Sequence, residues 1–212
     1  MRDIPVFSTQ NGVGSLFLSQ VPYTKSAFIK IQDTSDAKAF LQECIDFCRA
    51  VDASHIYISG HEICKSFPLY TSVLRMRAHA DTIGDTDACL LPITKDTLSQ
   101  WQEIYNQKIK HVPNGRWMNS SFADELLKRG DGYFVHLNGQ LIGTGIAYAD
   151  HISWVCSLQK ASGKEVVRAL IHALSSDVIE LEVASTNYKA VSLYEELGFT
   201  ICEIVSDWYV VE

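Results

Sequence analysis

The chain has 212 residues, of which 47% are hydrophobic, and a formal net charge of −7. This length suffices for one large domain or two small ones, each with its own hydrophobic core. No apolar run approaches the roughly 20 residues that span a bilayer, and the first residues lack the apolar segment of a signal peptide, so we expect a soluble cytoplasmic protein and no membrane partner. The negative charge argues against nucleic acid as a partner, because phosphate binding requires clustered lysine and arginine.

The six cysteines are dispersed, and most lie inside apolar runs, which is typical of reduced thiols in a protein core. Cys44 and Cys48 are one helical turn apart. Together with His61 and Cys64 they form a candidate metal site. The paired C-x-x-C spacing of a zinc ribbon is missing, so no metal is expected. A metal-dependent protein built on His55, His61 and Cys64 stays open as a distant alternative.

Residues 1–84 begin with an expected hairpin, because Gln10-Asn11-Gly12 separates two strand-like runs. The expected elements are strands at 6–8, 14–18 and 27–31, a helix at 36–49, a strand at 55–59, a short helical segment at 62–67 and a strand at 71–76. Gly84 and three aspartates make residues 80–87 the expected linker to the second part of the chain.

Residues 88–137 continue with a strand at 88–93 and two helices. The first helix has Leu98, Trp101 and Tyr105 at helical spacing and is broken by Pro113-Asn114-Gly115. The second helix begins near residue 121, with Ser120 or Ser121 as its expected N-cap, and ends at 129.

Residues 133–212 begin with a second expected hairpin, because Asn138-Gly139 joins strand-like runs at 133–137 and 140–148. Further expected elements are a strand at 152–158, an amphipathic helix at 164–174, a strand at 177–183, a helix at 188–197 and a last β pair at 199–205 and 208–211.

One stretch near the C-terminus carries the most specific pattern. Asn187 stands at a helix start, and the helix carries Ala190 and Tyr194 on one face before Gly198 stops it. This stretch resembles the closing motif N-x-x-A-x-x-L-Y-x-x-L-G-F of the GNAT superfamily of acyl-CoA-dependent N-acyltransferases. The element order of residues 88–212 also resembles that of a GNAT domain.

The resemblance implies the GNAT fold, an α+β fold with a central mixed β-sheet flanked by helices. Residues 85–212 would form the N-acetyltransferase domain. The element order of residues 1–84 resembles the second half of a GNAT domain without its two opening helices, so we expect a smaller, truncated and degenerate GNAT-like lobe there. An unrelated α+β extension is the alternative.

The resemblance also implies an activity, the transfer of an acetyl group from acetyl-CoA, as cosubstrate, to a primary amine of a small molecule or peptide by direct attack in a ternary complex. The strands at 152–158 and 177–183 would diverge around the pantetheine, with a backbone N–H near Val155 to Ser157 holding the thioester oxygen. The positions implied for cofactor binding are Val155, Cys156, Ser157, Leu158, Lys160, Ser162, Gly163, Lys164, Asn187, Ala190 and Tyr194.

Tyr194 would protonate the leaving sulfur, because its ordinary pKa of about 10 keeps the proton in place at neutral pH. Otherwise it packs as an ordinary aromatic of its helix. Asn187 would bind the amide-rich arm of the cofactor, cap the helix, or do both. The candidates for the general base are Glu182, if it faces the gap, and His151, which titrates in the useful range. In many family members a chain of water molecules deprotonates the amine, and in that case neither residue is needed as a base.

The stretch 159–167 departs from the phosphate loop of the family, which usually reads Q/R-x-x-G-x-G/A so that backbone N–H groups can close around phosphate. Gly163 fits the first glycine and Glu165 replaces the second. In another alignment both glycines are lost, to Glu165 and Val167. An acid is unfavourable beside a diphosphate, although Lys160 and Lys164 would compensate. The departure motivates a second hypothesis, a catalytically silent GNAT-like module that serves as a binding scaffold.

The sequence does not identify the acceptor amine. Recognition would depend on the segment 97–129, in which Trp101, Trp117 and the polar run 114–121 line an acceptor pocket or fill a surface loop. The N-terminal lobe would cover that pocket or mediate the formation of a homodimer.

Overall fold

The computed structural model describes residues 6–110, 112 and 115–211. The N-terminal residues 1–5 and two residues of the predicted helix break, Pro113 and Asn114, lie outside the described residues. The chain forms two compact units. Unit 1 comprises Met1–Val73, Lys110–Trp117 and Ile204–Glu212, and unit 2 comprises Leu74–Ile109 and Met118–Glu203.

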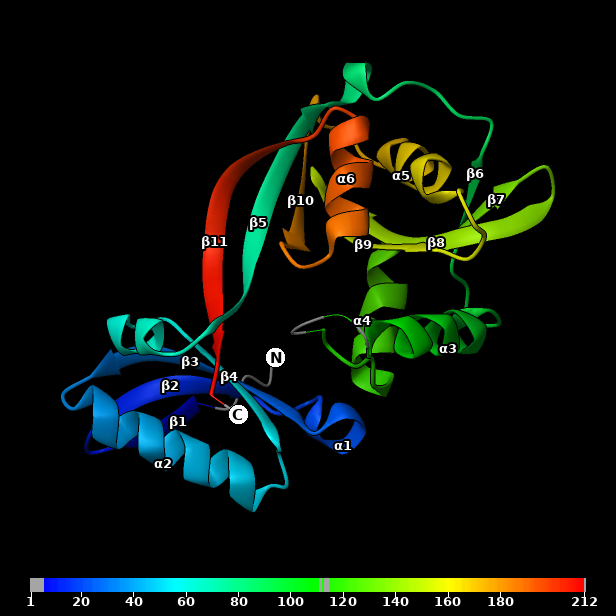
Figure 1. Cartoon of the computed structure of the whole chain (residues 1–212). Coiled ribbons are helices and arrows are strands. Elements are labelled where there is room, and N and C mark those ends of the chain that lie inside the picture. Colours follow the sequence, from blue (N-terminus) through cyan, green and yellow to red (C-terminus); the bar gives the residue numbers. More distant parts are fainter. Residues whose placement is uncertain (1–5, 111, 113–114, 212) are drawn as a thin grey trace. The chain divides into compact units, whose positions relative to one another are not determined.

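Unit 1 is a sheet with strands in the spatial order β1-β2-β3-β4-β11 and with helix α2 along one face (Figure 1). Its elements are β1 (Val6–Thr9), β2 (Gly12–Phe17), α1 (Val21–Thr24), β3 (Ser26–Thr34), α2 (Ala37–Ala50), β4 (His55–Ser59), a 3-10 helix (Glu62–Ser66), the first part of β5 (Leu69–His79) and the last part of β11 (Thr200–Val210). Strands β1 to β3 are antiparallel, whereas β4 is parallel to β3 because α2 forms a crossover between them.

Helix α2 provides much of the core of unit 1. Asp36 caps it by accepting a hydrogen bond from the Ala39 backbone N–H at 3.0 Å. Phe40, Cys44 and Cys48 recur at four-residue spacing and are fully buried against the sheet. Burial raises the pKa of the Cys44 thiol to about 12, which keeps it protonated and unreactive.

All six cysteines of the chain are free, and four of them are buried. Within the described part of the chain, no three His, Cys, Asp or Glu side chains come together as metal ligands, so the structure gives no support to the metal-dependent alternative. None of the described helices has the length and apolar character needed to cross a membrane.

The predicted elements of residues 1–84 are confirmed, with one unpredicted helix and with shifted ends, of which β3 at Ser26–Thr34 instead of 27–31 is an example. The hairpin turn lies between Thr9 and Gly12, as predicted. Helix α1 was not predicted, because four residues are too few to show a helical period. Strand β5 runs to His79 rather than ending at residue 76.

Unit 2 is a mixed sheet in the spatial order β11-β5-β10-β9-β8-β7-β6, with α5 and α6 on one face and α3 and α4 on the other (Figure 1). Its elements are the last part of β5, a 3-10 helix (Ala80–Thr82), β6 (Cys89–Pro92), α3 (Leu98–Ile109), α4 (Ser120–Arg129), β7 (Gly132–Leu137), β8 (Gln140–Tyr148), β9 (His151–Ser157), α5 (Gly163–Ile171), β10 (Val178–Ala184), α6 (Tyr188–Glu196) and the first part of β11. The predicted mixed α+β fold class is confirmed, and the order of these elements matches the prediction until the last strand.

Three predictions in this region were wrong in detail. The expected β pair at 199–205 and 208–211 is one strand, β11, because Ser206 and Asp207 supply no glycine or proline to turn the chain. The N-cap of α4 is Asn119 and not Ser120 or Ser121, since the Asn119 side chain accepts the Phe122 N–H at 2.9 Å. Helix α5 ends at Ile171, and the residues after it form tighter turns.

The expected linker, residues 80–87, contains the 3-10 helix Ala80–Thr82 and then an irregular segment. The compact units follow spatial contacts rather than chain order, so they do not test a division between residues 84 and 85. That boundary, and the interpretation of residues 1–84 as a degenerate copy of a GNAT domain, stay predictions.

Gly143 on β8 allows α5 to approach the sheet. A Cβ atom at this position would lie 2.4 Å from Val166 Cγ2 and 2.5 Å from the Cys156 carbonyl oxygen. We therefore expect Gly143→Ala to lower the free energy of unfolding by about 1–3 kcal/mol through overpacking. Urea unfolding followed by circular dichroism would measure this loss. Gln140→Ala, at the exposed start of the same strand, is the control, and equal midpoints for the two variants would contradict the close approach.

Candidate functional site

Strands β9 and β10 pair over a short distance and then separate. They are parallel, and the ladder between them contains two residue pairs, Glu180 with His151 and Leu181 with Ile152. Beyond these pairs β9 continues to Ser157 and β10 to Ala184 without further pairing. The structure thus agrees with the expectation that these two strands diverge.

A β-bulge in β9 lies where the ladder ends. Ile146 of β8 pairs with Trp154 and its neighbour Ala147 pairs with Ile152, so Ser153 is an extra residue of β9. A bulge of this kind bends the strand that carries it and increases its twist. Past the bulge β9 stays with β8 as far as the pair of Gly143 with Ser157, and it no longer pairs with β10.

The end of β9 directs backbone N–H groups away from β8. The Leu158 N–H donates to the Ile142 carbonyl of the β8 strand at 2.8 Å. Because N–H groups alternate sides along an antiparallel strand, those of Val155 and Ser157 point to the side that β10 has left. These are the N–H groups for which oxyanion binding was predicted.

The loop before α5 has features of a phosphate-binding turn. Ala161 has a positive φ of 68°, and the first backbone bond of α5 runs from the Val166 N–H to the Ser162 carbonyl at 3.0 Å. The N–H groups of Gly163, Lys164 and Glu165 therefore precede the helical hydrogen bonds, as at any helix start. The Ser162 hydroxyl, in contrast, lies 2.8 Å from the Ser157 hydroxyl and closes the loop internally.

Gly163 makes room for a neighbouring helix rather than for a ligand. A Cβ atom there would lie 2.4 Å from Leu193 Cδ1 of α6. The sequence predicted a glycine that admits phosphate, whereas the space beside this glycine is filled by a leucine.

The charges around the loop are mostly paired. Glu165 accepts hydrogen bonds from the Thr86 hydroxyl and from Arg168 Nη1, the latter at 2.7 Å. Lys164 forms an ion pair with Glu196 at 2.7 Å. Lys160 is exposed and has no ion-pair partner in the part of the chain that the structure describes. The unfavourable charge of Glu165 is therefore offset by Arg168, and Lys160 is the cation left for an anionic ligand.

Tyr194 of α6 is buried in the core of unit 2. It is 8% exposed, and its ring lies edge-on to that of Phe199 with centroids 5.8 Å apart. It belongs to the same buried cluster as Ile152 and Leu181, the last pair of the ladder between β9 and β10. Burial raises the pKa of the Tyr194 phenol to about 12. The phenol therefore keeps its proton at every physiological pH, and it packs as a core aromatic.

Asn187 is the N-cap of α6. Its Oδ1 accepts a hydrogen bond from the Ala190 N–H at 3.4 Å, and the turn before it is closed by the Asn187 N–H on the Ala184 carbonyl at 2.9 Å. Ala190 is half-buried and packs against the core. The capping role predicted for Asn187 is thus confirmed, whereas its contact with a cofactor stays a prediction.

Glu182 lies beside the point where β9 and β10 diverge, but its side chain is bound by Arg75. It alternates along β10 with the buried residues Leu181 and Val183, so its carboxylate lies on the other face of the strand. Arg75 Nη2 donates to Glu182 Oε1 at 2.9 Å, and the same guanidinium contacts Glu203 and Glu180. The Oε1 atom of Glu182 is thus already bound to Arg75.

His151 lies at the other end of β9 from the N–H groups of Val155 and Ser157. It forms the first pair of the ladder, opposite Glu180, where the two strands are still joined. Two predicted residues remain. Cys156 lies between Val155 and Ser157 and has a buried side chain, and Leu158 follows Ser157. The structure thus brings together the residues from Val155 to Lys164, and it separates His151 from them.

Three residues that matter at this site were not predicted. Arg75 holds Glu182, while Arg168 and Thr86 hold Glu165. Arg75 and Thr86 are far from their partners in the sequence, and no local pattern marks them. Arg168 is the exception, because it stands three residues after Glu165 on a helix and such a pair is readable from spacing.

The tryptophans considered for an acceptor pocket have structural contacts. Trp101 is fully buried, and its indole N–H donates to the Tyr133 carbonyl at 2.9 Å within unit 2. Trp117 belongs to unit 1 and stacks on Tyr23 with ring centroids 3.7 Å apart. Trp101 is therefore a core residue and not the wall of a pocket.

No protein-family model matches the sequence, and no curated protein matches it either. Solved structures do match over nearly the whole chain. An acetyltransferase of the GNAT family from Colwellia psychrerythraea is 12% identical and has a TM-score of 0.52, with 98% of this chain and 84% of that chain covered. A GCN5-related N-acetyltransferase from Anabaena variabilis is 12% identical and has a TM-score of 0.59, with 94% and 59% covered.

The chain has the GNAT acetyltransferase fold. A conserved protein of unknown function from Staphylococcus epidermidis is also similar, with 10% identity, a TM-score of 0.59 and coverage of 99% of this chain and 94% of that chain. At such identities the likeness concerns the fold. The GNAT fold predicted from the closing motif and the element order is thereby confirmed.

The Asn187 cap provides a test of the local structure at the start of α6. Asn187→Ala removes the Oδ1 acceptor, whereas the Ala190 N–H keeps its 3.0 Å bond to the residue 187 carbonyl, so we expect the free energy of unfolding to fall by only about 0.5 kcal/mol. Asn187→Asp keeps an acceptor oxygen at this position and is expected to restore most of that stability. Thermal unfolding of both variants measures the effect, and an Asp variant as unstable as the Ala variant would contradict a capping role.

Proposed function

We propose that this protein transfers an acetyl group from acetyl-CoA to a primary amine at the divergence of β9 and β10 in unit 2. The single observation that carries the proposal is the two-pair ladder between these parallel strands. In unit 1 the parallel pair of β3 and β4 stays joined over five residue pairs, from Ser26 with His55 to Lys30 with Ser59. The chain therefore separates the parallel strands β9 and β10 and keeps the parallel strands β3 and β4 paired.

The groups at the divergence fit a ligand of this class. The outward N–H groups of Val155 and Ser157 suit carbonyl oxygens, which the amide-rich arm of acetyl-CoA and its thioester both supply. The start of α5 offers N–H groups and the positive end of a helix dipole, and Lys160 adds a cation for the diphosphate. When bound, acetyl-CoA supplies an activated acyl group.

Each catalytic group of the chain would have one role in the transfer of the acetyl group. One N–H group of Val155 or Ser157 would stabilise the negative charge that develops on the thioester oxygen as the amine attacks, and the other, about 7 Å away along the strand, would bind an amide carbonyl of the cofactor arm. The new C–N bond forms, the C–S bond breaks, and Tyr194 gives its phenolic proton to the departing thiolate. With its pKa raised to about 12, the phenol carries that proton throughout the neutral range, as an ordinary tyrosine also does.

The amine must lose a proton, and neither predicted base is well placed to take it. Glu182 is bound by Arg75, and His151 lies at the joined end of the strands. We propose that water carries this proton to solvent. The nature of the amine, a homodimeric state and a cytoplasmic location stay predictions from the sequence.

One observation favours the second candidate function, a catalytically silent GNAT-like module. Leu193 fills the space beside Gly163, and the loop before it is closed by the contact between Ser157 and Ser162. If that loop does not admit a diphosphate, the GNAT fold would serve as a binding scaffold.

Calorimetric titration with acetyl-CoA and assays over a panel of primary amines separate the two candidates. For the enzyme we expect saturable binding and turnover, and Tyr194→Phe is expected to lower kcat by about 100-fold or more, because general acid catalysis is lost, with little effect on cofactor binding. The control is Tyr188→Phe, on the same helix and 76% exposed, which should leave kcat unchanged. Absence of binding would exclude the enzyme.

The pH dependence of turnover tests the proposed acid separately. A tyrosine with its pKa raised to about 12 stays protonated up to that pH, so its contribution is complete below pH 11 and is lost only above it. We expect kcat to show no falling limb near pH 10, where an ordinary tyrosine titrates. A loss of kcat centred at pH 10 that Tyr194→Phe abolishes would contradict the buried position of the phenol.

A further inference from the structure

A pocket of about 410 Å3 lies within unit 1, away from the strands proposed for acyl transfer. It lies at the carboxyl end of β4, and residues from β3, from the segment after β4 and from β11 surround it. This volume is within the range of pockets that hold small molecules.

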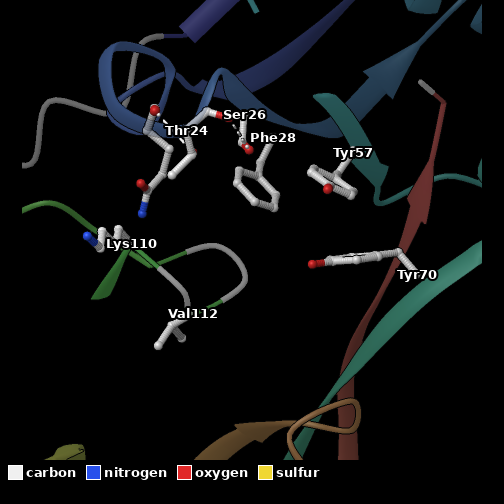
Figure 2. Close-up of a pocket in the computed structure, with 8 residues that line it drawn as sticks. Thr24, Ser26, Phe28, Tyr57, Tyr70, Lys110 and Val112 are labelled. Atoms are coloured by element: carbon white, nitrogen blue, oxygen red, sulfur yellow. Dashed lines mark hydrogen bonds between the residues drawn. The ribbon is translucent and has the colours of Figure 1, made fainter. Parts of the chain in front are cut away.

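Lys30 and Ser59 lie side by side on one face of the sheet and both line this pocket. They are register partners in the parallel strands β3 and β4. The preceding pair on the same face is Phe28 with Tyr57, whose rings stack with centroids 4.9 Å apart (Figure 2). Residues two positions further along each strand point to the same face, so the side chains of Lys30 and Ser59 are also neighbours.

Ser59 provides a nearly buried hydroxyl at the pocket. The residue is 3% exposed, and its hydroxyl makes no hydrogen bond within the part of the chain that the structure describes. Its oxygen is not sealed from solvent, so a molecule in the pocket can reach it. A buried hydroxyl without a partner costs free energy, and a ligand that bonds to it would recover that cost.

His61 adds a donor from the turn after β4. Its Nδ1 accepts the Ile63 backbone N–H at 3.2 Å, so the proton of the neutral ring is on Nε2. Gly60 allows this turn, because its φ is 96° and a Cβ atom there would collide with the Ile31 carbonyl oxygen. The turn therefore lies against β3 one residue beyond Lys30, and the His61 ring lines the same pocket.

Two carboxylates also line the pocket, and both already accept a hydrogen bond. Glu62 Oε1 accepts from Lys65 Nζ at 2.9 Å, and Asp207 Oδ1 accepts from Ser72 Oγ at 2.6 Å. The bond to Glu62 raises the pKa of Lys65, and the charge of the nearby Asp207 adds to that rise. Lys30, in contrast, has no ion-pair or hydrogen-bond partner among the described residues. The free groups at the pocket are therefore donors, and one of them is a cation.

This arrangement suits a carboxylate with a single negative charge. A carboxylate has about four lone-pair sites on its two oxygens, which a hydroxyl, an imidazole N–H and an ammonium can share. The charges of Lys30 and Lys65 balance those of Glu62 and Asp207, so a second negative charge on the ligand would lack a counterion.

We propose that this pocket binds an organic carboxylate, whose oxygens accept hydrogen bonds from Ser59 Oγ and His61 Nε2 beside the ammonium of Lys30. The carbon chain of the ligand lies against Val205 and the ring of Tyr209, which complete the wall of the pocket. The proposal concerns unit 1 alone and does not rest on acyl transfer in unit 2. A failure of either proposal leaves the other standing.

The test is an NMR titration of the full chain with butyrate, followed through the backbone amide of Gly60. The amide of Gly130, at the end of α4 in unit 2, is the reference signal. We expect butyrate to shift the Gly60 signal with a Kd of about 1 mM. n-Butylammonium has the opposite charge and should not bind, and n-butyl phosphate at pH 8 has a second charge and should bind no more tightly than butyrate.

Variants locate the site. Lys30→Gln is expected to weaken butyrate binding by about tenfold or more, since it removes the unpaired cation. Lys38→Gln is the matched control, because it changes the net charge equally and Lys38 is an exposed residue of α2 that does not line the pocket. Ser59→Ala should weaken binding several-fold through the loss of one hydrogen bond. It breaks no hydrogen bond within the described residues, so we expect this variant to fold.

Three results would overturn the proposal. The first is n-butylammonium binding as tightly as butyrate, or n-butyl phosphate binding tenfold more tightly, because the site would then not select a carboxylate. The second is equal butyrate affinity of Lys30→Gln and Lys38→Gln, with Ser59→Ala also unchanged. The third is a titration that shifts the Gly130 signal and leaves that of Gly60 in place.

Discussion

The structure of unit 2 depends on the point at which β9 and β10 stop pairing. The extra residue Ser153 lets β9 follow β8 while it leaves β10, so one insertion in one strand sets both the end of the ladder and the direction of the free N–H groups. Everything else at the candidate site is placed relative to this point, with the loop before α5 at the open end and His151 at the joined end. In unit 1 the corresponding parallel pair stays joined.

Ion pairs determine which charged side chains near the divergence of β9 and β10 are left to interact with a ligand. The carboxylates of Glu165 and Glu182 face arginines, and the ammonium of Lys164 faces Glu196. Each pair is at least partly exposed and contributes little to stability by itself. Its effect is on the local charge, because a carboxylate next to a guanidinium repels an anionic ligand less than a bare carboxylate does.

The order of elements was predictable because hairpin dipeptides, helical periods and a closing glycine are local signals. The same holds for the Asn187 cap. Two contacts depended on residues distant in sequence and were not predictable, the packing of Leu193 against Gly163 and the ion pair of Arg75 with Glu182. The bulge at Ser153 lies within the β8–β9 hairpin, but no glycine or other residue type marks it in the sequence. The continuous strand β11 was wrongly divided at Ser206 and Asp207, although neither residue is a glycine or proline that would turn the chain.

The contact between Gly163 and Leu193 joins the start of α5 to α6 with no space between them. Leu193 is adjacent in the chain to Tyr194, so the loop that would meet a diphosphate and the phenol that would give up a proton are mechanically linked. Any rearrangement of the loop at Gly163 would have to be accommodated by the Leu193 side chain of the helix that also carries Tyr194.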